Sequence, residues 1–433
     1  MFFHKNHLKA LNVNFLMIPV RFFDRERRNF SSFALDPDVL MVHRQKRYYQ
    51  QLFNEMNLLT KGILLLAILA CSCTGQKSGE RDALAGWDIG PFTKVDSLNP
   101  ILGPAPGTWY CPVRKDSVQW QIKDVFNPAA VVRDGKVYML YRAEDSVGVY
   151  NGTSRIGLAV SDDGLNFERL PVPVFYPEHD HMLSLEWEGG VEDPRIVEDE
   201  QGTYYMTYTA YDGTRTRLCI ATSEDLIAWR KHGVVFRNVD PELELTLSFK
   251  SGLIVSRLEG ERLVATKIGG LYWMYWNVGD LYLATSEDLI RWEPVMEEDG
   301  TSYKPALAPR PDKPGVDNLM CEPGPAAILT DKGILVFYNG ISSSATSGTG
   351  IEPGAAMTWA GVQALFAADD PSVELVRQDM AFILPDRPYE ITGQVNNVTF
   401  IEGLVFFRNR WFLYYGTADS YIAAATAEGR QIP

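Results

Sequence analysis

The sequence predicts an all-β protein, a five-bladed β-propeller, over residues 91–433. Three observations support this. A short apolar strand that ends in Ser-acid-Asp and an aromatic residue occurs in five copies, an aromatic-rich strand precedes each copy, and the copies stand about 60–80 residues apart. Each unit is thus a β-meander, and a radial array of such units closes on itself and protects its strand edges. Helical patterns are nearly absent, and a pair of β-sandwiches is the alternative fold.

The repeated strand is clear in three copies and weaker in two. The clear copies are Leu158–Asp163, Ile220–Asp225 and Leu283–Asp288, which lead to Phe167, Trp229 and Trp292; the weaker ones are Ala364–Asp369 and Ile422–Thr426. The aromatic-rich strands are Val137–Arg142, Tyr204–Tyr211, Leu271–Trp276, Ile334–Asn339 and Trp411–Gly416. A further short strand followed by a Gly or Asp turn opens three units, at Ala130–Val132, Arg195–Val197 and Ala327–Leu329. Aromatic residues in such strands are core residues by default.

The segment 187–196 carries two acids and an arginine close together, Glu192, Asp193 and Arg195. Pro194 fixes its own φ and keeps Asp193 out of the helical region, and the glycine pair before them allows a tight turn. We expect a stiff, non-helical presentation of Asp193 at the start of a strand, which suits a general acid. The alternative is an Asp–Arg pair that only fastens a turn, and such structural ion pairs are common.

A propeller brings polar residues of different units together. Its innermost strands point toward a central channel, and sites form at one mouth of that channel. Polar residues at equivalent positions should therefore converge; the candidates are Asn127, Arg142, Asp193, Glu322, Asn339 and Asp419. This convergence favours a functional role for Asp193.

Composition narrows the classes of function. The formal net charge of −14 over 433 residues argues against nucleic acid as a partner. The cysteines are odd in number and widely separated, apart from the pair Cys71 and Cys73, which predicts neither a disulfide framework nor a metal site. No residue pattern indicates a cofactor.

Residues 56–73 have the features of a lipoprotein-type secretory signal. A single lysine precedes an apolar run that is too short to span a bilayer, and a small residue stands before Cys71. We expect Cys71, or as the weaker candidate Cys73, to be the lipidated N-terminus, followed by a tether over residues 74–90. Residues 1–55 are interpreted as an upstream extension caused by start-site choice. The predicted location is the bacterial cell envelope, in the periplasm or at the cell surface.

Five short motifs follow one another along the chain: Phe126–Ala129, Tyr141–Ala143, Ser154–Gly157, Gly190–Arg195 and Tyr414–Asp419. In this order they resemble glycoside hydrolase family 130, which contains mannoside phosphorylases and β-mannosidases on a five-bladed propeller. The resemblance extends from about Phe126 to Ala425.

The resemblance implies roles for individual residues. It makes Asp193 the general acid, whose proton travels through a hydroxyl of the bound sugar. The sugar contacts that it implies are Asn127, Arg142, Ser154, Arg155 and Asp419. Glu192 and Asn339 complete the predicted substrate-binding set. For Arg142 and Arg155, an ion pair with Glu144 or a strand-end carboxylate is an equally weighted alternative. Candidate sugar-stacking platforms are Trp187, Trp273 and Trp276, with core packing expected for at least two of them.

Cationic residues separate the two branches of this family, because a phosphorylase must hold inorganic phosphate with converging Arg, Lys or His. Phosphorylase members resemble one another in an Asn-Arg-Asp or Asn-Lys-Asp turn and a Tyr-His-Gly strand end. Here Val239 and Asn339 occupy the two cationic positions. Lys250 and Lys267 lie nearby in the sequence and retain some positive charge.

A hydrolase instead needs a carboxylate that deprotonates water, about 6.5–9.5 Å from the acid in inverting enzymes. Glu322 is the candidate base, because the Pro-Gly-Pro after it holds it rigid and family hydrolases resemble the chain in carrying a Glu there. The alternative for Glu322 is a structural pair with a strand-end Lys or Arg. Asp280 is the imperfect match to another acid that some family hydrolases carry after the tryptophan of the third unit.

The sequence therefore predicts an inverting exo-β-mannosidase that acts on β-1,2-linked mannosides, with the linkage resting on the resemblance alone. A mannoside oligosaccharide is the expected partner, and no metal or cofactor is expected. We expect the protein to contact the membrane only through its lipid anchor. Two alternatives stay open: a β-mannoside phosphorylase that uses Lys250 or Lys267, and a non-catalytic carbohydrate-binding lipoprotein.

Overall fold

The computed structural model describes residues 85–236, 249–300, 302–343, 346–347, 350–351 and 356–429. The upstream extension, the signal segment with Cys71, and Val239 lie outside these residues, so their interpretations stay predictions. The chain divides into Met1–Glu80 and Arg81–Pro433, and all that follows concerns the second unit. Within the described ranges, no helix is long and apolar enough to cross a membrane.

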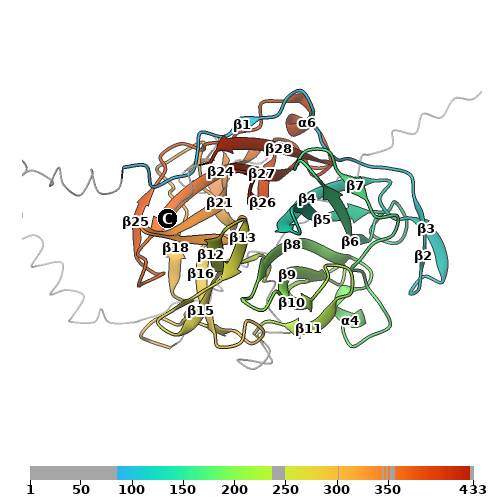
Figure 1. Cartoon of the computed structure of the whole chain (residues 1–433), viewed down its shortest axis with the longest axis horizontal. Coiled ribbons are helices and arrows are strands. Elements are labelled where there is room, and N and C mark those ends of the chain that lie inside the picture. Colours follow the sequence, from blue (N-terminus) through green and yellow to red (C-terminus); the bar gives the residue numbers. More distant parts are fainter. Residues whose placement is uncertain are drawn as a thin grey trace, which may run out of the picture. The chain divides into compact units, whose positions relative to one another are not determined.

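Antiparallel strands make up most of the described structure (Figure 1). The first sheet contains β4 (Asp124–Arg133), β5 (Lys136–Glu144), β6 (Ser154–Ser161) and β7 (Glu168–Arg169). The second contains β8 (Gly190–Glu198), β9 (Tyr204–Tyr211), β10 (Thr216–Ser223) and β11 (Arg230–Val234).

The third and fourth units are less regular. The third contains β12 (Gly252–Glu259), β13 (Arg262–Ala265), β14 (Lys267–Ile268), β15 (Leu271–Trp276), β16 (Leu281–Ser286), β17 (Glu293–Pro294) and β18 (Pro305–Leu307). The fourth contains β19 (Met320–Pro323), β20 (Ala327–Thr330), β21 (Gly333–Ser343), β24 (Met357–Phe366) and β25 (Glu374–Arg377).

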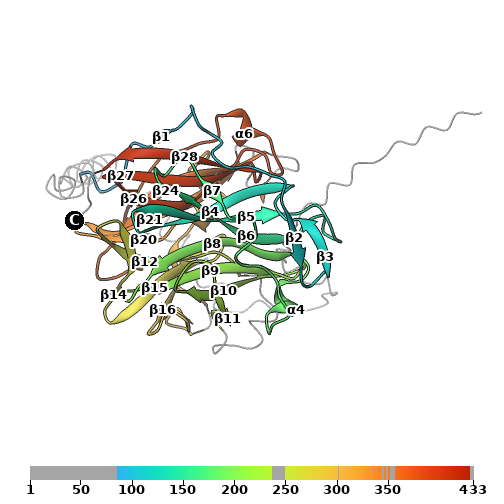
Figure 2. The ribbon, with the colours of Figure 1, turned by 45° about the vertical axis from the view of Figure 1, so that its right-hand side comes forward.

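The last sheet joins the two ends of the described domain. It contains β26 (Thr399–Phe407), β27 (Arg410–Thr417), β28 (Tyr421–Glu428) and, from the N-terminal side, β1 (Thr93–Lys94). Figure 2 shows β1 beside β28, where Thr93 pairs with Thr426. The smaller elements are the hairpins β2 (Thr108–Cys111) with β3 (Asp116–Gln119) and β22 (Thr346–Ser347) with β23 (Gly350–Ile351), and the short helices α4 (Leu183–Glu186) and α6 (Pro388–Ile391).

The prediction of an all-β protein is confirmed, and each predicted unit corresponds to a set of antiparallel strands. The predicted bounds of β9 and β15 match those of the structure. The first strands of the third and fifth units, β12 and β26, were not predicted, although Gly260 follows β12 directly; β26 is followed by Arg408 and Asn409 instead of a Gly or Asp turn.

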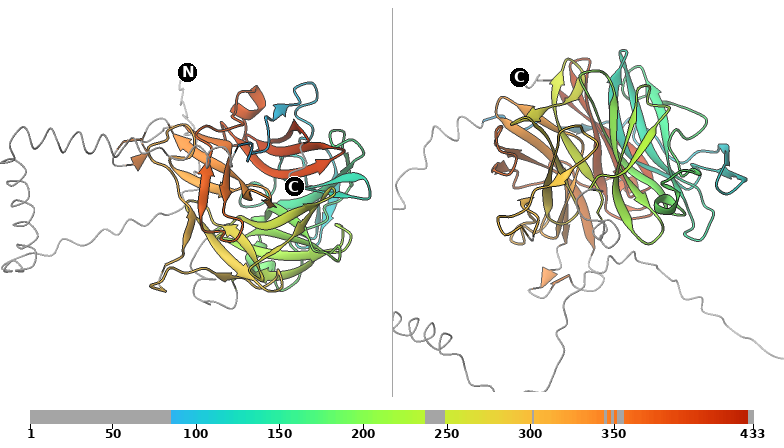
Figure 3. Two further views of the ribbon diagram at one scale, coloured as in Figure 1. Left: turned by 60° about the vertical axis from the view of Figure 1, so that its left-hand side comes forward. Right: turned by 90° about the horizontal axis from the view of Figure 1, so that it is seen from below.

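The first strands of successive units are neighbours. β4 contacts β8 and β26, β8 contacts β12, and β12 pairs in parallel with β20. Figure 3 shows the red strands of the last sheet between the orange strands of the fourth unit and the teal strands of the first, in agreement with the contacts of β26 with β24 and β4. This order suits a radial array, and a closed five-bladed propeller stays a prediction.

The domain begins within the segment predicted as a tether. Ile89 is buried, its N–H donates to Gln363 Oε1 at 2.9 Å, and Gln363 Nε2 donates back to the Ile89 carbonyl at 2.8 Å. Ile89 of the predicted tether therefore packs against β24, because its apolar side chain is buried and both of its backbone groups bind Gln363.

The repeated Ser-acid-Asp motif is a turn that ends the third strand of a unit. In the first unit Asp163 Oδ1 accepts the N–H groups of Leu165 and Asn166, both at 2.8 Å, and Ser161 Oγ accepts the N–H of Gly164 at 2.9 Å. The same contacts recur in the second and third units, around Asp225 and Asp288. The motif recurs in these three units because it ends their third strands in the same turn, so its aspartates carry a structural role.

We expect the substitution Asp163→Ala to lower the free energy of unfolding by about 1–2 kcal/mol at neutral pH, because it removes the acceptor of two backbone N–H groups. Although its partial burial opposes the charge, hydrogen bonds from Asn166 and Leu165 hold the pKa of Asp163 below its ordinary value. A lowered folded-state pKa means that the stabilisation is present above about pH 4 and is lost as the pH falls further. Urea unfolding at several pH values measures this difference.

The matched control is Asp162→Ala, at the neighbouring acid, whose side chain is 77% exposed in its ion pair with Lys136. An exposed pair of this kind contributes little, so we expect a change within about 0.5 kcal/mol. Equal losses in both variants would contradict the structural reading of the motif.

Candidate active site

The first strands of the first two units contain a register shift, a β-bulge, that changes the direction of a polar side chain. The register of β4 shifts between Phe126 and Pro128, and that of β8 between Glu192 and Arg195. Asn127 and Asp193 occupy these points with φ of 47° and 48°. A bulge bends its strand and re-aims a side chain, and each of these two residues is followed by proline.

The expectation for Asp193 is therefore right about its non-helical backbone and wrong about its place at the start of a strand. Asp193 lies inside β8, which begins at Gly190. The difference arises because the bulge, rather than the strand end, presents the side chain, and pairing with β9 continues on both sides of it.

The same position in other units also carries a polar residue. Ser251, with φ of 60°, precedes β12, Glu322 precedes Pro323 in β19, and Glu402 sits at the register shift in β26. Asn127, Asp193, Ser251, Glu322 and Glu402 thus come from five units, and all five are buried. Sequence reasoning found three of them. The signal for Glu402 was a polar residue followed by glycine one strand ahead of the aromatic strand β27.

Arg142 connects the first two units through four side chains. Its Nη1 donates to Asp193 Oδ1 at 3.1 Å, its Nη2 donates to Glu144 Oε1 at 2.7 Å and lies 2.9 Å from Glu192 Oε1, and its Nε donates to Ser154 Oγ at 3.0 Å. The ion pair of Arg142 with Glu144, the alternative interpretation, is present, and Arg142 also contacts the predicted acid, while its contact with a sugar stays a prediction. Asn127 Nδ2 donates to the same Asp193 oxygen at 2.9 Å.

Lys250 lies between the two predicted catalytic carboxylates. Its Nζ is 3.1 Å from Glu322 Oε1 and 3.7 Å from Asp193 Oδ2, so these two oxygens are at most about 7 Å apart. This upper limit is compatible both with the shorter spacing of retaining glycosidases and with the lower end of the inverting range. Ser251 Oγ donates to Glu322 Oε1 at 2.7 Å. Arg142, Asp193, Lys250 and Glu322 are called the polar centre below.

Arg195 holds the backbone on which the two carboxylates stand. Its Nε donates to the Gly324 carbonyl at 2.9 Å, its Nη2 to the Pro323 carbonyl at 2.6 Å, and its Nη1 to the Asp193 carbonyl at 3.3 Å. The same Nη1 lies 2.9 Å from Glu402 Oε1, although neither oxygen of Glu402 accepts a well-oriented hydrogen bond within the described part of the chain. One guanidinium thus joins β8, β19 and β26.

Burial and charge set the protonation of the centre. Burial opposes the charge of Asp193, but Arg142 and Lys250 outweigh it and hold the pKa of Asp193 below its ordinary value. Burial raises the pKa of Glu192 to about 7, against the attraction of Arg142. Burial likewise raises the pKa of Asp419 to about 7. Of these two adjacent acids, Glu192 therefore has the higher proton affinity.

The side chains of Arg155 and Asn339, two other predicted substrate-binding residues, bind groups of the protein itself. Arg155 is 0% exposed, and its Nη1 donates to Asp145 Oδ2 at 2.8 Å and to the Thr153 carbonyl at 2.9 Å. Asn339 is also 0% exposed, donates to the Ile401 carbonyl at 3.0 Å and accepts the Ile401 N–H at 2.7 Å. Both side chains fix backbone next to the site.

The remaining candidates lie around the polar centre or away from it. Asp280 is partly exposed and follows Gly279, whose backbone pairs with Cys321 beside Glu322. Lys267 is exposed and lies over the ring of Tyr272, 4.9 Å from its centroid.

Of the three tryptophans proposed as sugar-stacking platforms, one belongs to the hydrophobic core and two make contacts with other protein groups. Trp276 is fully buried among Phe236, Phe249 and Tyr303. Trp273 is partly buried and its indole N–H donates to a backbone carbonyl, and one face of Trp187 is covered by a guanidinium 4.9 Å away.

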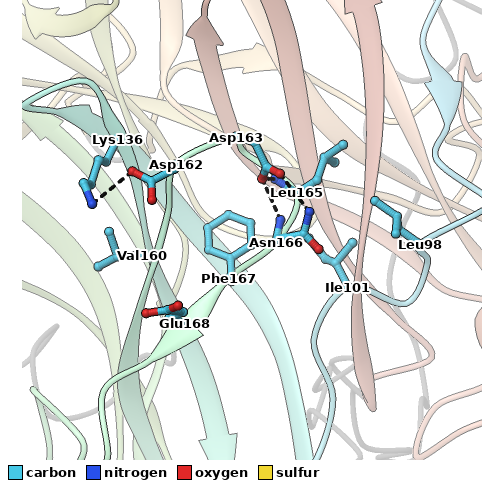
Figure 4. A pocket seen from close by; sticks show the side chains of 10 residues that line it. All are labelled: Leu98, Ile101, Lys136, Val160, Asp162, Asp163, Leu165, Asn166, Phe167 and Glu168. Atoms are coloured by element: carbon cyan, nitrogen blue, oxygen red, sulfur yellow. Dashed lines mark hydrogen bonds and ion pairs between the residues drawn. The ribbon is translucent and has the colours of Figure 1, made fainter.

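A cavity of about 530 Å³ lies elsewhere, at the turn between β6 and β7 (Figure 4). Its walls include Asp163 and Phe167, which belong to the structural turn motif, and Lys136 at the start of β5, together with Leu98 and Ile101. None of the predicted site residues lines it. The described residues contain no group of three or more His, Cys, Asp or Glu that could hold a metal ion.

Known proteins match this chain over most of the described domain. The family profile named Glyco_hydro_130 and described as beta-1,4-mannooligosaccharide phosphorylase matches residues 110–432. A 1,2-beta-oligomannan phosphorylase of Thermoanaerobacter sp. (strain X514) is 31% identical, over 72% of this chain and 93% of that protein.

Solved structures are more similar still. A putative glycosidase from Bacteroides thetaiotaomicron VPI-5482 is 44% identical, with a TM-score of 0.74 over 79% of this chain and 98% of that one. A structure reported with family 130 glycoside hydrolases that target beta-1,2 mannosidic linkages in Candida mannan is 41% identical, with a TM-score of 0.74 over 81% and 99% of the two chains.

We expect Arg195→Met to lower the free energy of unfolding by about 3–5 kcal/mol, because it leaves three carbonyls and Glu402 buried without their cation. Burial raises the pKa of Glu402 well above its ordinary value, which weakens the preference of this side chain for its charged form. Glu402→Gln should therefore cost less than about 1.5 kcal/mol. Urea unfolding of both variants decides the point. If Glu402→Gln were as damaging as Arg195→Met, the ion pair rather than the carbonyl contacts would hold the strands.

Proposed function

Because the chain belongs to glycoside hydrolase family 130, we propose that it is an inverting exo-acting β-mannosidase that cleaves β-1,2-linked mannosides on a five-bladed propeller. The observation that carries the proposal is the pair of buried carboxylates, Asp193 and Glu322, on either side of the Lys250 ammonium. They come from different units, so a sugar bound between them meets one carboxylate from each side.

In this mechanism Glu322 deprotonates the attacking water, and Asp193 returns a proton to the leaving group by way of a sugar hydroxyl. In the free protein Arg142 and Lys250 favour ionised Asp193, and burial gives Glu192 the higher pKa of the two acids. A sugar hydroxyl that displaces Lys250 from Asp193 removes one of these cations, which raises the proton affinity of Asp193. Substrate binding therefore prepares the acid.

The charge balance of the polar centre favours water over phosphate. A phosphate ion carries up to two negative charges and needs cations with free valence. Here Arg142 contacts Asp193, Glu192 and Glu144, and Lys250 contacts Asp193 and Glu322. Every cation of the centre is thus already matched by at least two carboxylates.

Phosphorolysis is the second candidate function. The names of curated relatives support it, among them the 1,2-beta-oligomannan phosphorylase, and so does the presence of Lys250, an ammonium that is 28% exposed beside both carboxylates. A non-catalytic carbohydrate-binding protein has no comparable support, because it does not need two buried carboxylates across one cation.

The deciding experiment incubates the purified protein with β-1,2-mannobiose, with and without inorganic phosphate, and separates the products by chromatography. We expect free mannose at equal rates in both conditions. Mannose 1-phosphate formed only with phosphate would establish the second candidate instead. Binding without any turnover would favour the non-catalytic reading.

The matched variants are Asp193→Asn and Glu322→Gln, which remove the charge and keep the shape. We expect each to lower kcat by at least about a hundredfold, since each removes one proton-transfer group. Retained binding of mannobiose in calorimetry shows that the loss lies in the chemical step. Unchanged turnover in Glu322→Gln would exclude it as the base.

The dependence of kcat/KM on pH reports the groups of the free enzyme. If the proton on Glu192 is needed, activity is present below its pKa of about 7 and falls as the pH rises through that value. Because Asp419 has a similar pKa, the variants Glu192→Gln and Asp419→Asn separate the two groups. We expect the alkaline fall to change in Glu192→Gln and to persist in Asp419→Asn; the reverse result would assign it to Asp419.

A further inference from the structure

We propose that Tyr150, seated on Tyr211 and Gly213, is a sugar-stacking platform for the leaving-group side of an oligosaccharide. The inference rests on the proposed function and deepens it, because it makes a chain of sugars rather than a single glycosidic bond the ligand of the site. Nothing in the sequence motifs pointed to Tyr150, which stands in the connection between β5 and β6.

The ends of four strands place this connection beside the candidate active site. In register, Glu144 pairs with Ser154, Ser154 with Gly190, and Gly190 with Tyr211. This row begins at a carboxylate that binds Arg142 and ends at Tyr211. The connection between β5 and β6, residues 145–153, joins two members of the row, so it lies at the same edge as the polar centre.

Tyr211 links the platform to the charged groups. Its ring centroid lies 6.3 Å from that of Tyr150, with the rings tilted by 45°. Burial, and after it the charge of Glu192, raises the pKa of the Tyr211 hydroxyl, and Arg142 acts in the opposite direction. The ring is therefore within electrostatic reach of the same two groups that surround Asp193.

The Tyr150 ring rests on a glycine that no other residue replaces easily. Gly213 has φ of 95°, and a Cβ atom built on it would lie 2.0 Å from the Tyr150 ring. The backbone of the turn between β9 and β10 thus lies directly against the Tyr150 ring and fixes its position.

The 145–153 connection is tied down at both ends. Asp145 Oδ1 accepts the N–H groups of Val147 at 3.2 Å and Thr153 at 3.0 Å, and its Oδ2 binds Arg155. Glu188 Oε2 accepts the N–H of Val149 at 2.9 Å. A pre-organised surface of this kind binds a ligand without first having to order a loop. It also gives Arg155 a role, since this arginine anchors the connection through Asp145.

The exposed face of the connection is apolar in spite of its position at a polar site. Tyr150 is 45% exposed, and the neighbouring Val149 and Val147 are 84% and 41% exposed. An exposed tyrosine offers a flat apolar face with a polar edge, and it suits a ligand that has both kinds of surface. A sugar ring has such faces, and continuity with the polar centre selects the substrate as the occupant over an unrelated protein.

The test compares Tyr150→Ala with the unchanged protein on β-1,2-mannotriose, with free mannose as a competitive inhibitor. We expect kcat/KM for the trisaccharide to fall about three- to tenfold through KM, as the loss of one aromatic contact implies. The inhibition constant of mannose, which fills only the terminal sugar position, should stay within twofold. Tyr150→Phe keeps the ring and should restore the trisaccharide value.

Tyr110→Ala is the matched control, because Tyr110 is a 58% exposed tyrosine in the hairpin strand β2. Tyr110→Ala should leave kcat/KM for the trisaccharide and the inhibition constant of mannose unchanged. Equal effects of Tyr150→Ala on mannose and on the trisaccharide, or no effect on either, would overturn the platform.

The proposal also stays testable if the protein turns over no mannoside. Calorimetry then measures the binding of mannotriose to the unchanged protein and to Tyr150→Ala. Weaker binding in the variant supports the platform independently of catalysis, and equal binding refutes it, whereas the absence of turnover counts only against the proposed reaction.

Discussion

One guanidinium determines how the two carboxylates of this protein face each other. Arg195 donates to the carbonyls of Asp193, Pro323 and Gly324, so it binds the backbone of the predicted acid and the backbone that follows the predicted base. Carbonyl contacts fix position without neutralising the side chains, because the carboxylates keep their own charges for Lys250 and the substrate. The separation needed by the chemistry is therefore set by a residue that is itself 3% exposed.

The cost of burying so many acids explains the uneven protonation of the site. A buried carboxylate stays ionised only beside a cation, and Arg142 and Lys250 supply this for Asp193. Glu192 and Glu402 receive less of that stabilisation and have raised pKa values. The fold thus places acids with lowered and with raised pKa values in one cluster, a pattern typical of sites in which the environment assigns acid and base roles to neighbouring carboxyl groups.

The strands could be predicted because every unit repeats them, and repetition separates a pattern from chance. The Ser-acid-Asp turn recurs in three units because each of these ends its third strand in the same way. The polar residues at the bulges were harder to find, because the units share a position and not a sequence: Asn127, Asp193 and Glu322 precede proline, whereas Ser251 and Glu402 precede glycine. Pairings such as Arg155 with Asp145 depend on which strand ends meet in space, and no local sequence pattern encodes that.

The choice between water and phosphate depends on charge rather than on fold, because curated phosphorylases and solved structures described as glycosidases or glycoside hydrolases both resemble this chain. A site selects phosphate when cations exceed carboxylates around the sugar, and it selects water when a carboxylate is free to accept a proton. In this protein Lys250 contacts Glu322 at 3.1 Å, so the ammonium available to attract an anion is held by the predicted base. Binding of phosphate would have to break that contact, whereas a neutral water can approach Glu322 with the contact intact.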